Sequence, residues 1–498
     1  MPTNYLDNYY ARLGIAKAAS QDELRQAYRR AARQMHPDGE NSSGSSELFL
    51  LVQEAYEVLS SAERRAAYDA TLPDDIEAPQ ALMVNTVYSR GTIIPGKEKQ
   101  NIYVLLDLMA VLPEEGALAA GRPPVNMSLV LDNSTSMAGP RLSRVTNAAA
   151  QFIRQIQPRD ILSVVTFNDR AEVLVPGSAG HDGQRTIALL SSLQSKGGTE
   201  LFNGLEAGLK EVQRHRNPAY TNHIILITDG RTYGDENKTL GLAQLAANLG
   251  ISISVVGIGA EWNEDFIDQL VSKAGGNSVY AARSADIQGL LEEKFNTLNE
   301  AFANNVKLHY QLGKEVALHY AFRISPETSN IALQAPLFLG SVPLGTSLTV
   351  LMEFEVSTLE EKAGELILAQ GELSLDVPFN PIPSTKTRFR LSLPIDAGDK
   401  PQTPPQMLVD AIAQLSYYRM QEEVRQRIKE GQAEKAAKRM RMLATHMLSA
   451  GQRGLAKTML LEAEKLKQGQ ALDAKSGKQI KYGTRSLIEK PGRKESPR

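Results

Sequence analysis

The stretch Leu129-Val130-Leu131-Asp132-Asn133-Ser134-Thr135-Ser136-Met137 decides the fold of the middle of the chain. Its apolar first half is typical of a buried parallel strand, which stops at a carboxylate followed by two hydroxyls at alternate positions. Asp132, Ser134 and Ser136 therefore offer hard oxygen ligands where a strand ends. Such ligands at the carboxyl edge of a parallel sheet suit a hard divalent cation such as Mg²⁺. Taken alone, the stretch also fits an ordinary turn, because Asp and Ser are common helix caps.

The surrounding residues alternate between strand and helix patterns, which predicts a doubly wound α/β sheet over residues 123–303. The strands are expected at 126–131, 161–167, 171–175, 223–228, 252–258 and 278–281. The helices are expected at 142–156, 184–193, 201–214, 240–249, 264–273 and 286–303. Two more oxygen ligands fall in loops at the predicted ligand-binding edge of this sheet, and they are Thr199 and Asp229.

Together, these five residues resemble the complete metal-ion-dependent adhesion site of von Willebrand factor A domains. The resemblance implies that Asp132, Ser134 and Ser136 form the first loop, Thr199 the second and Asp229 the third. It implies a bound divalent cation, Mg²⁺ or Mn²⁺, whose sixth ligand is water or a carboxylate of a partner protein.

The N-terminal residues predict a small bundle of helices. Ser20 and Glu23 form a possible capping box at the start of a helix over 22–35, and a helix over 47–59 carries an apolar stripe. A basic face runs along the first of these helices, because its arginines recur at three- and four-residue spacing. These arginines are Arg25, Arg29, Arg30 and Arg33. A merely solvated face of an amphipathic helix is the alternative.

His36-Pro37-Asp38 lies between these two helices, and with them it resembles the J domain of the DnaJ family over residues 5–72. The resemblance implies that the basic helix docks on an acidic surface of a DnaK-type chaperone. It also implies that the tripeptide triggers ATP hydrolysis by that partner, and that the J domain hydrolyses nothing itself. The implied docking residues are His36, Pro37, Asp38, Arg25, Tyr28, Arg29, Arg30 and Arg33. Gly39 departs from the lysine that often follows the tripeptide in the family.

Neither a Gly/Phe-rich segment nor a cysteine zinc module follows the J domain. Residues 73–80 are instead expected to form a short acidic linker about which the J domain can reorient. Strand patterns at 81–112 and again after 304 predict an antiparallel β-sandwich, split into 81–122 and 304–400 by the inserted A domain. The later strands are expected at 306–311, 316–324, 347–356, 364–375 and 385–393. This arrangement resembles a group of bacterial A-domain proteins.

The C-terminal part predicts an all-α unit over 401–470, a helical hairpin or bundle. Its helices are expected at 407–429, 433–448 and 455–467. Residues 471–498 are rich in Lys, Gly and Ser, which predicts a flexible tail. The fold class is therefore multidomain, with an all-α J domain, an α/β domain inserted in a sandwich and C-terminal helices.

The composition excludes several classes of function. A net charge of -2 over 498 residues gives no general case for binding nucleic acid or an anionic membrane. The absence of cysteine excludes disulfides, thiolate catalysis and cysteine zinc sites. No apolar run approaches the length that spans a bilayer. We therefore expect a cytoplasmic protein that binds neither nucleic acid nor membrane.

Two functions fit these features. In the first, the chain is a co-chaperone whose J domain stimulates a DnaK-type ATPase while the magnesium-dependent A domain recruits a client protein or complex. In the second, it is a metal-dependent scaffold or regulator of another machine, such as an AAA-type ATPase, and the J domain is ancillary. The chain itself is expected not to be an enzyme, since the sequence identifies no general base near the metal ligands.

Overall fold

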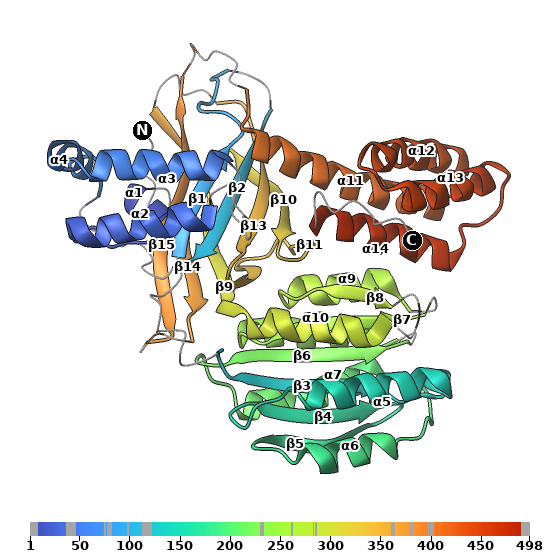
Figure 1. Cartoon of the computed structure of the whole chain (residues 1–498). Helices are drawn as coiled ribbons and strands as arrows, with labels where there is room; N and C mark the ends of the chain where they lie inside the picture. The colour runs from blue at the N-terminus through green and yellow to red at the C-terminus, as the bar shows by residue number, and fades with distance from the viewer. Residues whose placement is uncertain are drawn as a thin grey trace.

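The computed structural model of the chain places helical units on either side of a β-sandwich, with an α/β domain below it (Figure 1). The described residues are 8–35, 46–73, 76, 82–96, 99–111, 122–229, 234–259, 262–281, 283, 286–359, 364–378, 380, 382–396, 398 and 403–489. His36, Pro37 and Asp38 lie outside them. No helix in the described ranges is long and apolar enough to cross a bilayer.

The N-terminal unit is a helical bundle, as the sequence predicts. Its helices are α1 (Tyr9–Leu13), α2 (Gln21–Met35), α3 (Ser46–Leu59) and α4 (Ala62–Asp69). The capping box at α2 is formed, because the Ser20 N–H donates to the Glu23 carboxylate at 2.7 Å and the Glu23 N–H donates to Ser20 Oγ at 3.2 Å. Buried apolar side chains of α2 and α3, such as Leu24 and Val52, form the core of the unit.

The sandwich contains two antiparallel sheets within the described residues. The five-stranded sheet has the order β1 (Leu82–Tyr88), β2 (Gln100–Ala110), β13 (Ser347–Val356), β10 (Val316–Ser325) and β11 (Ser329–Asn330). The four-stranded sheet has the order β12 (Leu337–Pro343), β9 (Ala301–Leu312), β14 (Gly364–Asp376) and β15 (Ser384–Ile395). Alternate residues along β2, including Val104 and Leu106, face the core between the sheets.

The α/β domain is inserted between β2 and β9, as predicted. Its sheet has the order β5 (Ala171–Ala179), β4 (Ile161–Phe167), β3 (Val125–Asp132), β6 (Thr221–Thr228), β7 (Ser252–Ile258) and β8 (Ser278–Ala281). The edge strand β5 pairs antiparallel and the others pair in parallel. The helices are α5 (Pro140–Ile153), α6 (Gly183–Ser191), α7 (Leu201–Arg214), α8 (Glu236–Asn248), α9 (Glu264–Lys273) and α10 (Ile287–Asn299).

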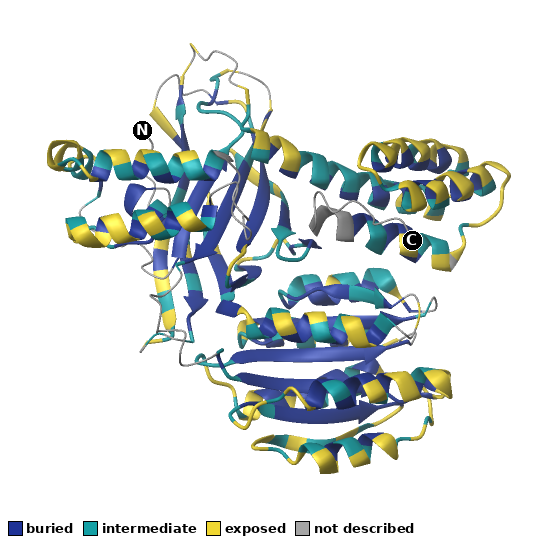
Figure 2. Cartoon of the chain, viewed as in Figure 1, coloured by how far each residue is buried: buried dark blue, intermediate teal, exposed yellow. Residues whose placement is uncertain are grey.

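The helices cover both faces of this sheet, so its central strands are buried (Figure 2). Helices α5 and α10 pack on one face, and α7, α8 and α9 pack on the other. The helix predicted over 286–303 is too long, since α10 ends at Asn299 and β9 begins at Ala301. Ala301 and Ala303 pair with β12, a strand that the sequence did not reveal. Gly340 and Pro343 interrupt the apolar pattern of β12, and three register shifts bend its pairing with β9.

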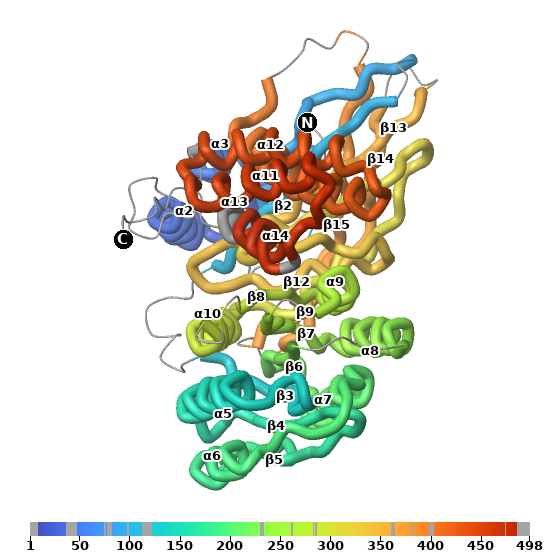
Figure 3. The backbone as a smooth tube through the Cα atoms, turned by 90° about the vertical axis from the view of Figure 1, so that its right-hand side faces the viewer, coloured from blue at the N-terminus to red at the C-terminus, as the bar shows by residue number. Residues whose placement is uncertain are grey.

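The C-terminal unit has one more helix than the sequence predicts. It contains α11 (Gln406–Lys429), α12 (Ala433–Ser449), α13 (Arg453–Lys467) and α14 (Ala474–Glu489). The prediction of a flexible tail over 471–498 is therefore wrong for residues 474–489, and residues 490–498 lie outside the described residues. Helix α14 lies on the side of the C-terminal helices that faces the α/β domain (Figure 3).

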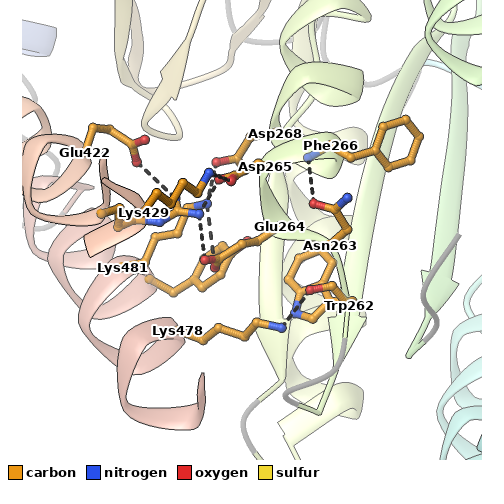
Figure 4. A network of polar contacts seen from close by, with 12 residues as sticks. Trp262, Asn263, Glu264, Asp265, Phe266, Asp268, Glu422, Lys429, Lys478 and Lys481 are labelled. Atoms are coloured by element: carbon orange, nitrogen blue, oxygen red, sulfur yellow. Dashed lines mark hydrogen bonds and ion pairs between the residues drawn. The ribbon is translucent and has the colours of Figure 1, made fainter. Parts of the chain in front are cut away.

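A network of charged and aromatic side chains joins α14 to the α/β domain (Figure 4). Lys481 Nζ and Arg485 Nη2 each lie 2.7 Å from Asp268 Oδ2 of α9. Lys478 Nζ donates to the backbone oxygen of Trp262 at 2.9 Å, and the Tyr482 ring stacks on the Trp262 ring with centroids 5.9 Å apart. Burial alone raises the pKa of Asp268, but the charges of Arg485 and Lys481 outweigh it and hold this pKa well below its usual range.

Helix α11 adds a second contact to α9 and also covers the sandwich. Arg425 Nη2 lies 2.7 Å from Glu264 Oε1, and Lys429 pairs with Asp265. The first half of α11 packs through Leu408 and Leu415 on the outer face of the five-stranded sheet. Since α11 contacts both the sandwich and α9, it fixes the α/β domain relative to the rest of the chain.

The J domain is docked on the sandwich, which contradicts the expectation that it reorients about residues 73–80, of which only 73 and 76 are described. Met83 and Met109, on the outer face of the five-stranded sheet, pack against the apolar core of the J domain. A Cβ at Gly14, whose φ is 63°, would lie 2.2 Å from Val111 Cγ2, so the two units approach as closely as a glycine allows. The Glu47 carboxylate accepts the Met407 N–H at 2.8 Å and also the Gln406 N–H, which caps the start of α11.

Asp268→Asn tests the contact between α14 and the α/β domain. The substitution leaves Lys481 and Arg485 buried without an opposing charge at this position, so the protection of α14 against hydrogen exchange should fall by about 3 kcal/mol. Glu206→Gln, which removes an exposed ion pair to Lys210 at 2.9 Å, is the control and should change little. Because folding lowers the pKa of Asp268, its stabilisation is complete above a pH of about 4, the usual pKa, and is lost in more acidic solution. Unchanged protection of α14 in Asp268→Asn contradicts this account.

Candidate functional site

Asp132 stands at the end of the central strand β3, whose residues are all buried. Its Oδ1 accepts the Ser134 N–H at 2.8 Å, and its Oδ2 accepts the Thr228 hydroxyl at 2.7 Å. Burial raises the pKa of Asp132 to about 6, although the hydrogen bonds from Ser134 and Thr228 act in the opposite direction. A cation at this edge of the sheet would relieve the cost of burying the ionised carboxylate.

Ser134, Ser136 and Asp229 gather beside it. The hydroxyl oxygens of Ser134 and Ser136 are 3.0 Å apart, and Ser136 Oγ donates to Asp229 Oδ1 at 2.6 Å. Asp229 directly follows β6, the parallel neighbour of β3, and only 2% of its surface is exposed. The parallel pairing of the two strands thus brings residues nearly a hundred positions apart to the same edge of the sheet.

Thr199 belongs to the loop before α7. This loop lies against the loop that follows β3. Thr135 donates to the Gly197 oxygen through its N–H at 3.1 Å and through its hydroxyl at 2.7 Å. The Lys196 N–H donates to the Asn133 oxygen at 2.9 Å. These contacts hold the loop that carries the partly buried Thr199 against the loop of Asp132, Ser134 and Ser136.

Arg141 is a site residue that the sequence reasoning missed. Its Nη1 donates to Asp229 Oδ2 at 2.6 Å and to the Ser136 backbone oxygen at 3.2 Å. The available signal was its place at the start of the helix that follows the D-x-S-x-S loop. That signal is weak, because a basic residue near a helix end is ordinarily solvated.

The donor set fits a hard divalent cation. Two carboxylates and three hydroxyls supply oxygen only, which suits Mg²⁺ or Mn²⁺ and not a metal that prefers nitrogen or sulfur. No group of three or more His, Asp or Glu side chains with metal-binding geometry occurs in the described residues, so this hydroxyl-rich set is unlike a histidine or multi-carboxylate site.

The basic face of α2 remains open to solvent. Arg25, Arg29 and Arg33 are exposed, whereas Tyr28 and Arg30 are partly buried. The Tyr28 ring stacks on the Tyr56 ring of α3 with centroids 4.2 Å apart, so Tyr28 also supports the helix pair. Arg25 pairs with Asp22 at 3.3 Å, an exposed contact of little energetic weight. The structure thus presents three of the predicted docking residues together.

Family models match three parts of the chain. These are the DnaJ domain over residues 8–69, the von Willebrand factor type A domain over 126–293 and the Sll0103-like C-terminal alpha-helical domain over 406–490. The chain is therefore a fusion of a DnaJ domain with a von Willebrand factor A (VWA) domain and a C-terminal helical domain. A DnaJ domain indicates the potential to act with a DnaK-type chaperone, and a VWA domain indicates protein interaction, commonly with a divalent metal at the adhesion site.

Similar proteins support this composition. The uncharacterized protein sll0103 of Synechocystis sp. is 24% identical over 387 residues, which cover 74% of this chain and 90% of that protein. Chaperone protein DnaJ of Streptococcus agalactiae serotype Ia is 52% identical over 61 residues, which cover 12% of this chain and 16% of the chaperone. The likeness to the chaperone is thus confined to the J domain.

Solved structures share the fold of the larger part. The von Willebrand factor type A protein from Catenulispora acidiphila has a TM-score of 0.64 at 14% identity and covers 81% of this chain and 97% of its own. The ArnB paralog VWA2 from Sulfolobus acidocaldarius has a TM-score of 0.53 at 16% identity and covers 83% of this chain and 100% of its own. At these identities the likeness concerns the fold alone.

Asp132→Ala tests the metal site. The substitution removes the buried carboxylate that anchors the first loop, so Mg²⁺ binding measured by calorimetry on the full chain should weaken by at least about tenfold. Glu172→Ala, at an exposed carboxylate on the edge strand β5, should bind Mg²⁺ like the wild type. Equal Mg²⁺ affinity in Asp132→Ala and wild type contradicts the assignment of Asp132 as a ligand.

Proposed function

We propose that the chain is a co-chaperone: its J domain stimulates ATP hydrolysis by a DnaK-type chaperone, and its VWA domain recruits a client protein or complex through a divalent cation, Mg²⁺ in the first instance. The chain itself carries out no catalytic step in this proposal. The observation that carries it is the exposed arginine face of α2. Arg25, Arg29 and Arg33 stay exposed on this face although the sandwich and α11 cover other parts of the J domain.

The arginine face supports the chaperone half of the proposal. Arg25, Arg29 and Arg33 point away from the J-domain core on one face of α2, and α2 contacts the sandwich through a different residue, Gln34, whose Nε2 donates to the Ala110 oxygen at 3.3 Å. Arginine side chains in such a row attract an acidic surface and orient it before contact. An acidic face of a DnaK-type chaperone can therefore reach α2 without displacing the sandwich.

The edge of the VWA sheet supports the client half. When bound, the cation supplies an open coordination position that a client carboxylate can occupy. Ser134, Ser136 and Thr199 offer hydroxyl oxygens to the cation, and Asp132 and Asp229 offer negative charge. Thr228 orients Asp132 from behind through its hydrogen bond at 2.7 Å. The client is thus expected to present an Asp or Glu side chain.

The docked arrangement supports the coupling of the two halves. The J domain and the VWA domain both contact α11, directly at Glu47 and at Glu264. A client held at the VWA domain therefore stays at a fixed distance from the chaperone that α2 binds. This tethering raises the local encounter rate without requiring any new contact between client and chaperone.

Arg29→Glu tests the chaperone half. Reversing one charge in the middle of the exposed row should reduce the stimulation of single-turnover ATP hydrolysis by a DnaK-type chaperone by about tenfold at low concentration of the chain. The effect should shrink at high salt, because exposed charges are screened. Arg64→Glu, at an exposed arginine on α4 of the same domain, is the matched control and should retain stimulation. Equal stimulation by both variants would contradict docking through the arginine face and favour a scaffold whose J domain is ancillary.

A further inference from the structure

Arg141 reaches from the start of α5 across the metal site. Its guanidinium contacts Asp229 Oδ2 at 2.6 Å and the Ser136 oxygen at 3.2 Å. The Arg141 side chain is 43% exposed, whereas that of Asp229 is fully buried. The arginine therefore approaches from the solvent side and covers the carboxylate.

Arg141 does not stabilise the helix in which it lies. It is the second residue of α5, where the helix dipole favours negative side chains and disfavours a cation. The first turn of α5 contains no acidic residue that could offset this effect. The stabilising partner is instead Asp229 on another element. Gly259, directly after β7, lies beside the guanidinium, since a Cβ there would be in ordinary van der Waals contact with Arg141 Nη2 at 3.7 Å.

The contacts of Arg141 coincide with the ligand set of the cation. Asp229 receives Arg141 on one carboxylate oxygen and the Ser136 hydroxyl on the other. Asp132 and Asp229 together supply two carboxylates, and Arg141 pairs with that of Asp229. A divalent cation beside Asp229 would lie next to this positive charge, and two like charges at short range repel.

We propose that Arg141 is a built-in counter-ion of Asp229 and competes with a divalent cation for this carboxylate. This inference rests on the metal-binding part of the proposed function. It assigns to Arg141 the role of setting the metal affinity below the value that the oxygen ligands alone would give. Binding of the cation then requires the guanidinium to release Asp229, so the state of Arg141 reports whether the site is loaded.

The test is calorimetric titration of the full chain with Mg²⁺ in wild type, Arg141→Gln and Arg144→Gln. Losing a charge-assisted hydrogen bond that competes with the ion should tighten Mg²⁺ binding by about tenfold in Arg141→Gln. Arg144 is exposed on the next turn of α5, and Arg144→Gln removes the same formal charge as Arg141→Gln. The comparison therefore separates the direct contact with Asp229 from general electrostatics. Arg144→Gln should bind Mg²⁺ like the wild type.

A second readout is the thermal midpoint. In EDTA, the Arg141→Gln variant has neither the guanidinium nor a metal ion beside the buried carboxylate of Asp229. It should therefore unfold at a lower temperature than the wild type. Saturating Mg²⁺ should remove this difference, whereas a purely structural role of Arg141 would leave it in place. Arg141→Lys keeps the charge and should bind Mg²⁺ with nearly wild-type affinity, which covers the case in which Arg141→Gln does not fold without metal.

Two results would overturn the inference, and they are distinguishable. Wild type that binds Mg²⁺ while Arg141→Gln binds it no tighter would show that the arginine holds Asp229 in place for the ion. Absence of Mg²⁺ binding in wild type and in folded Arg141→Gln would remove the metal from the proposed function and this inference with it.

Discussion

The Glu47 carboxylate of the J domain caps the first turn of α11, and Arg425 and Lys429 near the other end of this helix pair with α9 of the VWA domain. One helix thus joins the units that carry the two candidate binding surfaces. Each of these contacts involves only a few residues. Between them, α11 packs along the outer face of the five-stranded sheet, which holds the helix in place. The relative position of the arginine face and the metal site depends on these contacts.

The buried charges around Asp268 determine where α14 packs more than they increase the stability of the fold. Removing two cations and a carboxylate from water costs several kcal/mol per ion, and their attraction offsets that cost only when the geometry is satisfied. Lys481 and Arg485 therefore bring little net stabilisation but strongly disfavour any other placement of α14, which would leave Asp268 unpaired. The aromatic stack of Tyr482 on Trp262 supplies the apolar part of the same contact.

Local pattern predicted much of this structure, because the relevant signals are local. The run from Leu129 to Asp132 shows that a strand is buried, and the strand order of a doubly wound sheet brings Asp229 beside it. Helix α14 escaped prediction because Gly477, Gly483 and several lysines make its sequence resemble a solvated tail. Its partners in the α/β domain lie more than two hundred residues earlier, as Asp268 does for Arg485. Arg141 and the docked J domain escaped for the same reason, since periodicity says nothing about tertiary contacts.

Single-turnover ATP hydrolysis by a DnaK-type chaperone, measured with the full chain or its His36→Gln variant, shows directly whether the chain is a co-chaperone. We expect that the wild-type chain accelerates hydrolysis and that the variant does not, although both fold alike and bind Mg²⁺ alike. Equal rates with wild type, variant and no added chain would contradict it. The VWA domain, its cation site and the docked helices would then serve a scaffold that works without a DnaK-type chaperone.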